Sequence, residues 1–116
     1  MWRTEAGTGA TREAAKLRER LARTQRQLKL VRANQRVLTE QVDHLAELAG
    51  DAETRKLVAE TPLADREWRQ ARTDLDRHTA LLDEARREAT ALLAEQDRLL
   101  DRLGELSPPG GLGGPT

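Results

Sequence analysis

Cysteine, tyrosine, phenylalanine and isoleucine are all absent from this chain of 116 residues, whose only aromatic side chains are Trp2 and Trp68. Without cysteine the chain can form neither a disulfide framework nor a metal site with thiolate ligands. A compact α/β or all-β domain of this length normally buries aromatic and β-branched residues in its core. Their scarcity therefore argues against strands anywhere in the protein.

Long apolar stretches are also missing. No segment approaches the roughly 20 apolar residues that span a membrane, and residues 1–10 lack the apolar run of a secretory signal. We therefore expect a soluble, cytoplasmic protein without membrane contact. The excess of arginine over lysine, 17 against 3, favours a bacterial source with a GC-rich genome.

The residues that dominate instead are leucine, alanine, arginine, glutamate, aspartate and glutamine, which are typical of long helices. Apolar residues recur at alternating steps of three and four in two segments, which is the pattern of a coiled-coil seam. The first seam runs from Ala14, at a heptad a position, to Ala49, and the second runs from Ala64 to Leu106 in a different phase. The sequence thus predicts an all-α protein with two long amphipathic helices.

The residues between the two seams can end one helix and start another. Gly50 is expected to close the first helix, and Thr61 and Pro62 are expected to cap and start the second. Two helices of similar length can each bury their seam by folding into an antiparallel coiled-coil hairpin. We therefore predict a flexible tail over 1–10, a helix over 11–49, a tip segment over 50–61, a helix over 62–106 and a disordered Pro/Gly-rich tail over 107–116.

Two registers of this hairpin keep a positions opposite d positions. In the first, the numbers of paired seam residues sum to 113, so that Gln35 lies opposite His78 and Arg20 lies beside Glu95. The first pair joins two polar seam residues in one layer, where they can form a hydrogen bond. An unpaired buried amide or imidazole would cost about 1 to 3 kcal/mol.

In the second register the numbers sum to 120, so that Arg20 meets Arg102 and Arg32 meets Arg86. Like-charged flanking pairs cost only about a few tenths of a kcal/mol each. The second register also leaves Gln35 and His78 facing apolar residues, which is the larger cost. The sequence therefore favours the first register and leaves the second open.

Apolar residues outside the seams are candidates for contacts with a protein partner. Leucines beside the second seam widen its apolar face, so a second copy of the hairpin is expected to cover it in a homodimeric four-helix bundle. Apolar residues of the tip segment fall out of heptad phase and form either a small cap or a docking surface. The candidate partner-binding residues are Leu57, Val58, Leu63, Trp68, Leu81, Leu93 and Leu100.

Trp68 has two possible roles near the tip. It lies at an a position and can close the core by packing on Leu45 and Leu63. Alternatively it anchors a partner, because tryptophan is enriched among the residues that dominate binding energy at interfaces.

Charge is segregated along a chain whose total charge is neutral. From the N-terminus through Arg36, ten basic residues accompany three acidic ones, a net charge of +7 that the remainder balances. One interpretation is a nucleic-acid-associated protein whose arginine-rich helix grips phosphates, through Arg18, Arg23, Arg26, Lys29, Arg32 and Arg36. The competing interpretation is a solvated outer face that acidic residues of the second helix neutralise in part, since no aromatic residue lies among the arginines to stack on bases.

The sequence contains no recognisable catalytic arrangement. No nucleophile can be placed with a base and an orienting acid, and no phosphate-binding loop is present. The spacing of Glu40, His44 and Glu47 could place three metal ligands on one helical face, but without a second histidine it is more typical of a solvated face. We therefore expect no enzyme, no cofactor, no metal and no small-molecule ligand. The leading hypothesis is a non-enzymatic coiled-coil interaction module, a scaffold, adaptor or assembly protein, and the alternative is nucleic-acid association.

Overall fold

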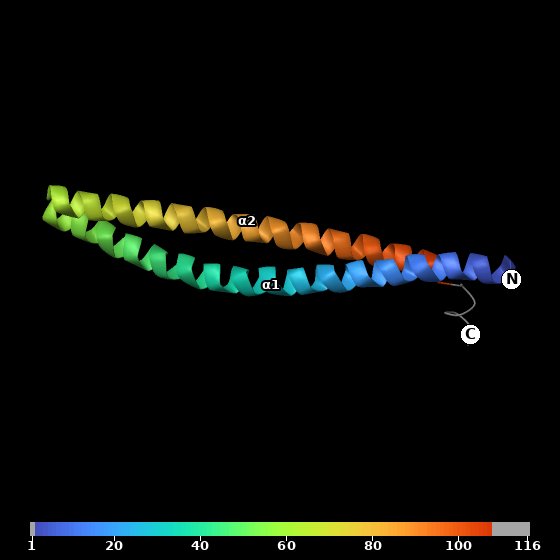
Figure 1. Ribbon diagram of the computed structural model, residues 1–116. Helices are drawn as coiled ribbons and strands as arrows, with labels where there is room; N and C mark the ends of the chain where they lie inside the picture. The colour runs from blue at the N-terminus through green and yellow to red at the C-terminus, as the bar shows by residue number, and fades with distance from the viewer. Residues whose placement is uncertain (1, 108–116) are drawn as a thin grey trace, which may run out of the picture. The chain divides into compact units, whose positions relative to one another are not determined.

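The computed structural model describes the backbone of residues 2–107 and the side chains of residues 9–107. Two helices account for nearly all of these residues: α1 spans Trp2–Ala59 and α2 spans Pro62–Leu106 (Figure 1). The helices run antiparallel and contact one another, and no strand occurs within the described range. The prediction of an all-α helical hairpin is confirmed.

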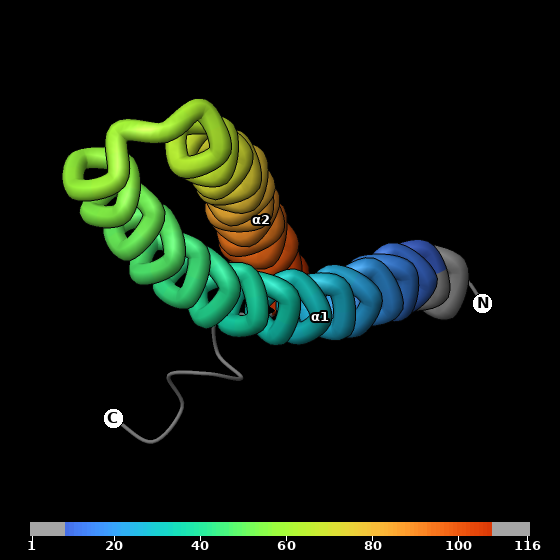
Figure 2. The backbone as a smooth tube through the Cα atoms, turned by 90° about the vertical axis from the view of Figure 1, so that its left-hand side faces the viewer, coloured from blue at the N-terminus to red at the C-terminus, as the bar shows by residue number. Residues whose placement is uncertain are grey.

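Glu60 and Thr61 alone join the two helices (Figure 2). Glu60 adopts a φ of 52°, and its N–H donates to the Lys56 carbonyl oxygen at 3.1 Å, which closes α1 with a left-handed cap. Thr61 caps α2, because its Oγ1 accepts a hydrogen bond from the Ala64 N–H at 3.1 Å. Pro62 disfavours helical geometry for Thr61 and needs no hydrogen-bond acceptor at the first helical position. Local chemistry thus places the start of α2 at the residue expected from the sequence.

The prediction that the first helix ends at Gly50 is wrong, because α1 continues to Ala59. A glycine ends a helix by taking the left-handed conformation, and among the described residues only Glu60 has a positive φ. Ala49 and Ala52 continue the heptad spacing across this glycine and are 5% and 2% exposed. Their burial shows that the seam extends past Gly50, and tertiary packing of this kind outweighs the cost of about 1 kcal/mol of one glycine in a helix.

The prediction of a flexible tail over 1–10 is also wrong, because the backbone of α1 is helical from Trp2. Extending an existing helix adds one hydrogen bond per residue without a new nucleation step, so the glycines of this segment do not end it. The tail predicted over 107–116 lies outside the described residues except for Ser107, which forms a bend.

Replacing the glycine at residue 50 and introducing a glycine at residue 60 are both expected to stabilise the protein. Gly50→Ala adds a Cβ that meets nothing within 4 Å, so the free energy of unfolding should rise by up to about 1 kcal/mol. Glu60→Gly relieves the strain of a side chain at positive φ, with a gain of about 1 kcal/mol or less. Urea denaturation followed by circular dichroism measures both changes. A loss of stability in Gly50→Ala would show that this glycine caps a helix.

Contacts divide the chain into two units. The terminal unit comprises Met1–Lys29 and Thr90–Thr116, and the tip unit comprises Leu30–Ala89. Each unit contains one stretch of α1 and one stretch of α2. The register of the two helices can therefore be determined for each unit by itself.

The terminal unit follows the first register. Arg20 Nη2 lies 2.9 Å from Glu95 Oε1, and Arg102 Nη2 lies 2.6 Å from Glu13 Oε1. These four residues lie at heptad g positions, which flank the seam. In the first register, where paired seam residues have numbers that sum to 113, opposing g residues have numbers that sum to 115, as both pairs do here. The predicted pair of Arg20 with Glu95 is confirmed. Because Arg102 pairs with Glu13, the contact of Arg20 with Arg102 that the second register would bring does not form here.

The tip unit follows the second register. Its core is formed by Leu38, Leu82 and Ala85, with Val42 packed against them. Leu38 and Leu82 are 7% and 4% exposed, and their numbers sum to 120. In the first register Leu38 would have faced Leu75 instead. The preference for the first register is therefore wrong in this unit.

The polar pair that favoured the first register does not form. His78 Nδ1 lies 2.9 Å from the Asp74 carbonyl oxygen one turn earlier in α2, and within the described range no hydrogen bond joins Gln35 to His78. This bond satisfies the His78 imidazole within its own helix, and no buried side-chain nitrogen or oxygen of the described residues, Gln35 included, lacks a partner. The desolvation cost on which the preference depended therefore does not arise. Arg86 Nη1 lies 3.7 Å from Asp83 Oδ1, and this ion pair offsets the repulsion of Arg86 by Arg32 expected in the second register. The packing of Leu38, Leu82 and Ala85 then decides the register of the tip unit.

Candidate interaction surfaces

Three aliphatic side chains project into solvent at the tip of the hairpin. Leu57 is 70% exposed, Val58 81% and Leu63 59%. They occupy the last turn of α1 and the first turn of α2, and we call them the tip surface. Single exposed aliphatic residues are normal, but three beside one turn form a concentrated apolar surface. Their exposure shows that they do not fold into a buried cap, which was one of the two alternatives left open by the sequence.

The tip surface has two sides. Val58 and Leu63 line a groove of about 390 Å³, the tip groove, whose other lining residues are Thr54, Arg55, Ala59, Thr61, Ala64 and Glu67. Leu57 lines a second groove of about 420 Å³, together with Lys56, Glu60, Thr61, Pro62 and Asp65. The first groove is almost entirely apolar, whereas charged side chains surround Leu57.

Ion pairs between the two helices hold the tip together. Arg55 Nε lies 3.9 Å from Glu67 Oε2, and Lys56 Nζ lies 3.5 Å from Asp65 Oδ1. A hydrogen bond from Arg69 lowers the pKa of Asp65, and Lys56 lowers it further, so this carboxylate keeps its charge to more acidic pH than an isolated aspartate. Together with the caps of α1 and α2, these pairs present the tip surface on an ordered support.

Trp68 supports the tip and does not line either tip groove. It is half-buried, and the Lys56 ammonium lies over its ring at 3.8 Å from the centroid. Such a cation–π contact at a partly exposed site contributes about 0.5–1 kcal/mol. Of the two roles considered for Trp68, this contact favours the structural one.

The other predicted partner residues belong to two different units. Leu81, which is 43% exposed, lies in the tip unit. Leu93 is half-buried and Leu100 is 47% exposed, and both lie in the terminal unit. The three leucines therefore do not form one surface of either unit.

Sequence reasoning overlooked three exposed aliphatic residues of α1. Leu30 is 71% exposed, Val37 is 51% exposed and Leu48 is 44% exposed, and all three lie in the tip unit. The spacing of seven residues between Leu30 and Val37 places these two on one face of the helix, outside the seam. The sequence contains this spacing, but the seam next to it is a much longer run of apolar residues at heptad spacing.

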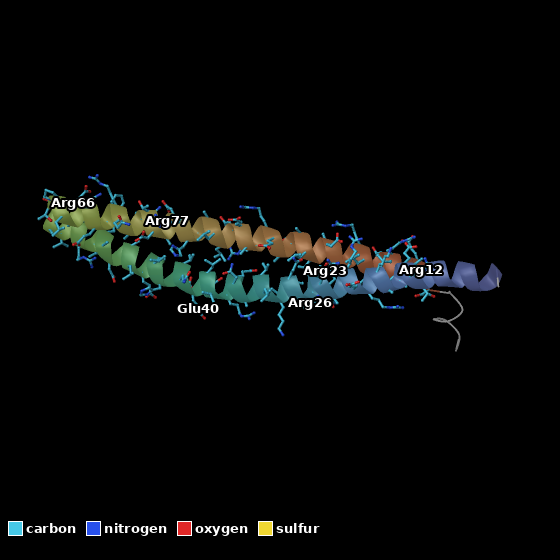
Figure 3. The ribbon with its side chains drawn as sticks, in the orientation of Figure 1. Arg12, Arg23, Arg26, Glu40, Arg66 and Arg77 are labelled. Atoms are coloured by element: carbon cyan, nitrogen blue, oxygen red, sulfur yellow. The ribbon has the colours of Figure 1, made fainter. Side chains whose placement is uncertain are left out.

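All six basic residues predicted to contact nucleic acid are exposed, and none has a hydrogen bond or ion pair with another described residue. Arg18, Arg23, Arg26 and Lys29 lie in the terminal unit, and Arg32 and Arg36 lie in the tip unit. Figure 3 marks Arg23 and Arg26 on α1. Among the described basic residues from 12 to 36, only Arg20 is neutralised by α2. The exposure of these side chains and the single pair of Arg20 with Glu95 agree with a solvated face that α2 neutralises only in part.

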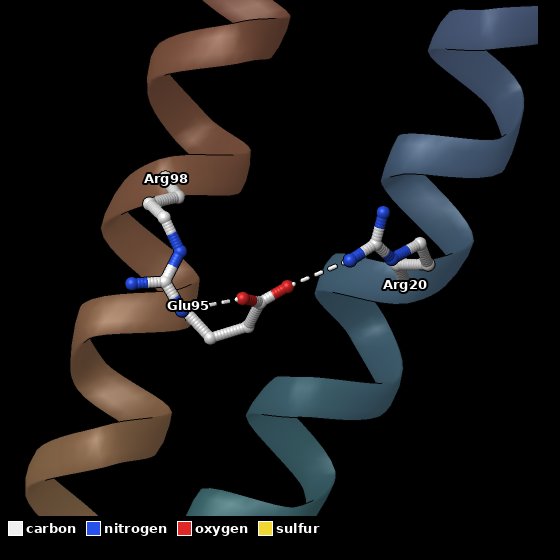
Figure 4. Close-up of polar contacts among 3 residues, drawn as sticks. All are labelled: Arg20, Glu95 and Arg98. Carbon is white, nitrogen blue, oxygen red and sulfur yellow. Dashed lines mark hydrogen bonds and ion pairs between the residues drawn. The ribbon is translucent and has the colours of Figure 1, made fainter.

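Glu95 binds two arginines at once (Figure 4). Its Oε1 accepts a hydrogen bond from Arg20 Nη2 at 2.9 Å, and its Oε2 accepts one from Arg98 Nη2 at 2.7 Å. The bond from Arg98 is the main cause that lowers the pKa of Glu95, and Arg20 lowers it further. Each oxygen of this carboxylate thus already has an arginine partner.

Within the described residues, no group of three or more histidine, aspartate or glutamate side chains is placed to hold a metal ion. No helix in the same range combines the length and apolar character needed to cross a membrane. No family model, curated protein or solved structure matches the chain. The geometry itself offers two contact surfaces, one apolar at the tip and one basic on α1.

Proposed function

We propose that this protein is a non-enzymatic coiled-coil interaction module whose tip groove receives aliphatic side chains of another protein. The observation that carries the proposal is the 81% exposure of Val58 beside Leu63 on an ordered turn. Burying an exposed valine or leucine on binding contributes about 1.5–3 kcal/mol each. Because the caps and ion pairs already order the tip, little of that gain is lost to ordering the chain.

The chemistry of the groove defines the partner that fits it. Its two charged members, Arg55 and Glu67, pair with each other across the helices. The groove therefore has no net charge, and its accessible lining is aliphatic. A complementary surface carries one or two leucine, isoleucine, valine or methionine side chains without an adjacent charge, because an unpaired charge buried against this lining would be costly.

Site-specific photocrosslinking in cells that make the protein tests the proposal. A photoreactive amino acid at Thr54, which lines the tip groove, is expected to give one discrete adduct with another protein. The same amino acid at Thr79, an exposed position in the middle of α2, is the matched control and should give none. Val58→Glu with Leu63→Glu should abolish the adduct while the helical circular dichroism spectrum is retained.

Two results would contradict this function. If Thr54 and Thr79 give the same adducts, the crosslinks come from nonspecific collisions. If Thr54 gives no adduct, the tip groove is unoccupied in the cell. An adduct made of two copies of this chain would replace the proposed partner with self-association.

A further inference from the structure

Six basic side chains of the terminal unit form an uncompensated positive surface on α1. We call this set the basic face, and its members are Arg12, Lys16, Arg18, Arg23, Arg26 and Lys29. Each is exposed, and none has a hydrogen bond or ion pair with a described residue. The sequence-based set lacked Arg12 and Lys16 and included two residues of the tip unit.

Helical spacing gathers these cations outside the seam. Arg12, Lys16, Arg23 and Arg26 follow one another at steps of four, seven and three residues, which keeps them on the side of α1 away from the seam. At a rise of about 1.5 Å per residue, the basic face extends over roughly 25 Å from Arg12 to Lys29. Figure 3 marks Arg12, Arg23 and Arg26 along this stretch.

Two carboxylates of the terminal unit are already paired with arginines outside the basic face. Glu13 is held by Arg102 at 2.6 Å, and Glu95 is held by Arg20 and Arg98. Between Arg12 and Lys29 on α1, Glu19 is the only carboxylate without an ion pair to a described residue. Six cations thus have one unpaired carboxylate among them on their own helix, and like charges three or four residues apart on a helix destabilise it by about a few tenths of a kcal/mol per pair. A bound polyanion would remove that repulsion.

We infer that the basic face binds the phosphates of duplex nucleic acid without reading base sequence. Four of its six members are arginines, whose planar guanidinium groups match phosphate oxygens in two-point contacts. Between residues 9 and 67 there is no aromatic side chain to stack on unpaired bases, which disfavours a single strand. A helix with charges along about 25 Å suits a duplex, which carries one negative charge per roughly 1.7 Å of its axis.

Fluorescence anisotropy with a labelled 30-base-pair duplex of mixed sequence tests this inference on the full chain. We expect binding at 25 mM salt and a steep loss as salt rises. If all six cations engage phosphates, affinity falls by about three orders of magnitude between 50 and 200 mM salt. The triple variant Arg12→Gln, Arg23→Gln, Arg26→Gln should bind at least about tenfold more weakly, and its slope of log affinity against log salt should be shallower by about 2.7.

The matched control removes the same charge from another surface. Arg66, Arg77 and Arg87 are exposed residues of α2 that also have no ion pair with a described residue, and their triple change to glutamine should alter affinity less than twofold. Circular dichroism checks that both variants keep their helices.

The inference is overturned if the wild-type chain does not bind the duplex at 25 mM salt. Equal weakening by the two triple variants would also overturn it, because net charge alone would then explain binding. Tighter binding to a 30-nucleotide single strand, or equal binding to polyglutamate, would replace the duplex with another polyanion.

Discussion

Leu82→Ala is expected to lower the free energy of unfolding by about 2 to 4 kcal/mol, which corresponds to a fall of about 10 °C or more in the melting midpoint. Leu82 is 4% exposed and packs with Leu38 and Ala85 in the core of the tip unit. The substitution removes apolar contacts and leaves a cavity between two helices. A core with so few large side chains has no second layer that could move in to fill it. Thermal and urea denaturation followed by circular dichroism measure the loss.

Leu81→Ala provides the control, because it removes the same atoms from the adjacent residue of the same helix. Leu81 is 43% exposed, so its loss should cost less than about 1 kcal/mol. A similar large loss at both positions would show that Leu81 is buried as well, as in a four-helix assembly of two chains. Small losses at both would contradict the core assigned to the tip unit.

Two pairs of introduced cysteines are expected to form disulfides within one chain. Leu38→Cys with Leu82→Cys tests the second register in the tip unit, and Leu21→Cys with Leu92→Cys tests the first register in the terminal unit. The chain has no cysteine of its own, so every cross-link comes from the introduced pair. A disulfide requires Cα atoms about 4.4–6.8 Å apart, which only residues of one seam layer satisfy. Mobility on non-reducing gels at low protein concentration measures the yield.

The control pairs move one partner by a heptad, which is about 10.5 Å along the helix. Leu38→Cys with Leu75→Cys and Leu21→Cys with Leu99→Cys should remain reduced under the same mild oxidation. Efficient cross-linking of Leu38→Cys with Leu75→Cys would show that the tip unit adopts the first register. Efficient cross-linking of Leu21→Cys with Leu99→Cys would show the same for the second register in the terminal unit.

The ends of the two helices show where local sequence signals suffice and where they do not. Thr61 and Pro62 act through their own backbone and side chains, so α2 starts where the sequence predicts. Gly50 is a different case, because glycine permits a helix end without requiring one. The burial of Ala49 and Ala52 on the seam outweighs that local tendency, and Glu60 closes α1 despite its side chain.

The candidate surfaces were predicted to a different extent. The sequence selected Leu57, Val58 and Leu63 because they lie outside the heptad phase, but it left open whether they form a small cap or a docking surface. Their exposure in the structure excludes the buried cap. The sequence also predicted the basic stretch of α1, but it did not predict which of its arginines pair with carboxylates of α2. Whether an arginine is neutralised depends on which carboxylate the other helix places beside it, and that depends on register.

By itself the sequence determined the helical class, the start of the second helix at Pro62 and the choice of apolar tip residues, because each follows from residues close together along the chain. The tertiary structure alone decided the register, which is the first in the terminal unit and the second in the tip unit. A heptad seam repeats every seven residues, so a slip of one heptad preserves the pattern of apolar positions. Only the contacts of particular side chains, such as Glu13 with Arg102 and Leu38 with Leu82, separate the two alignments.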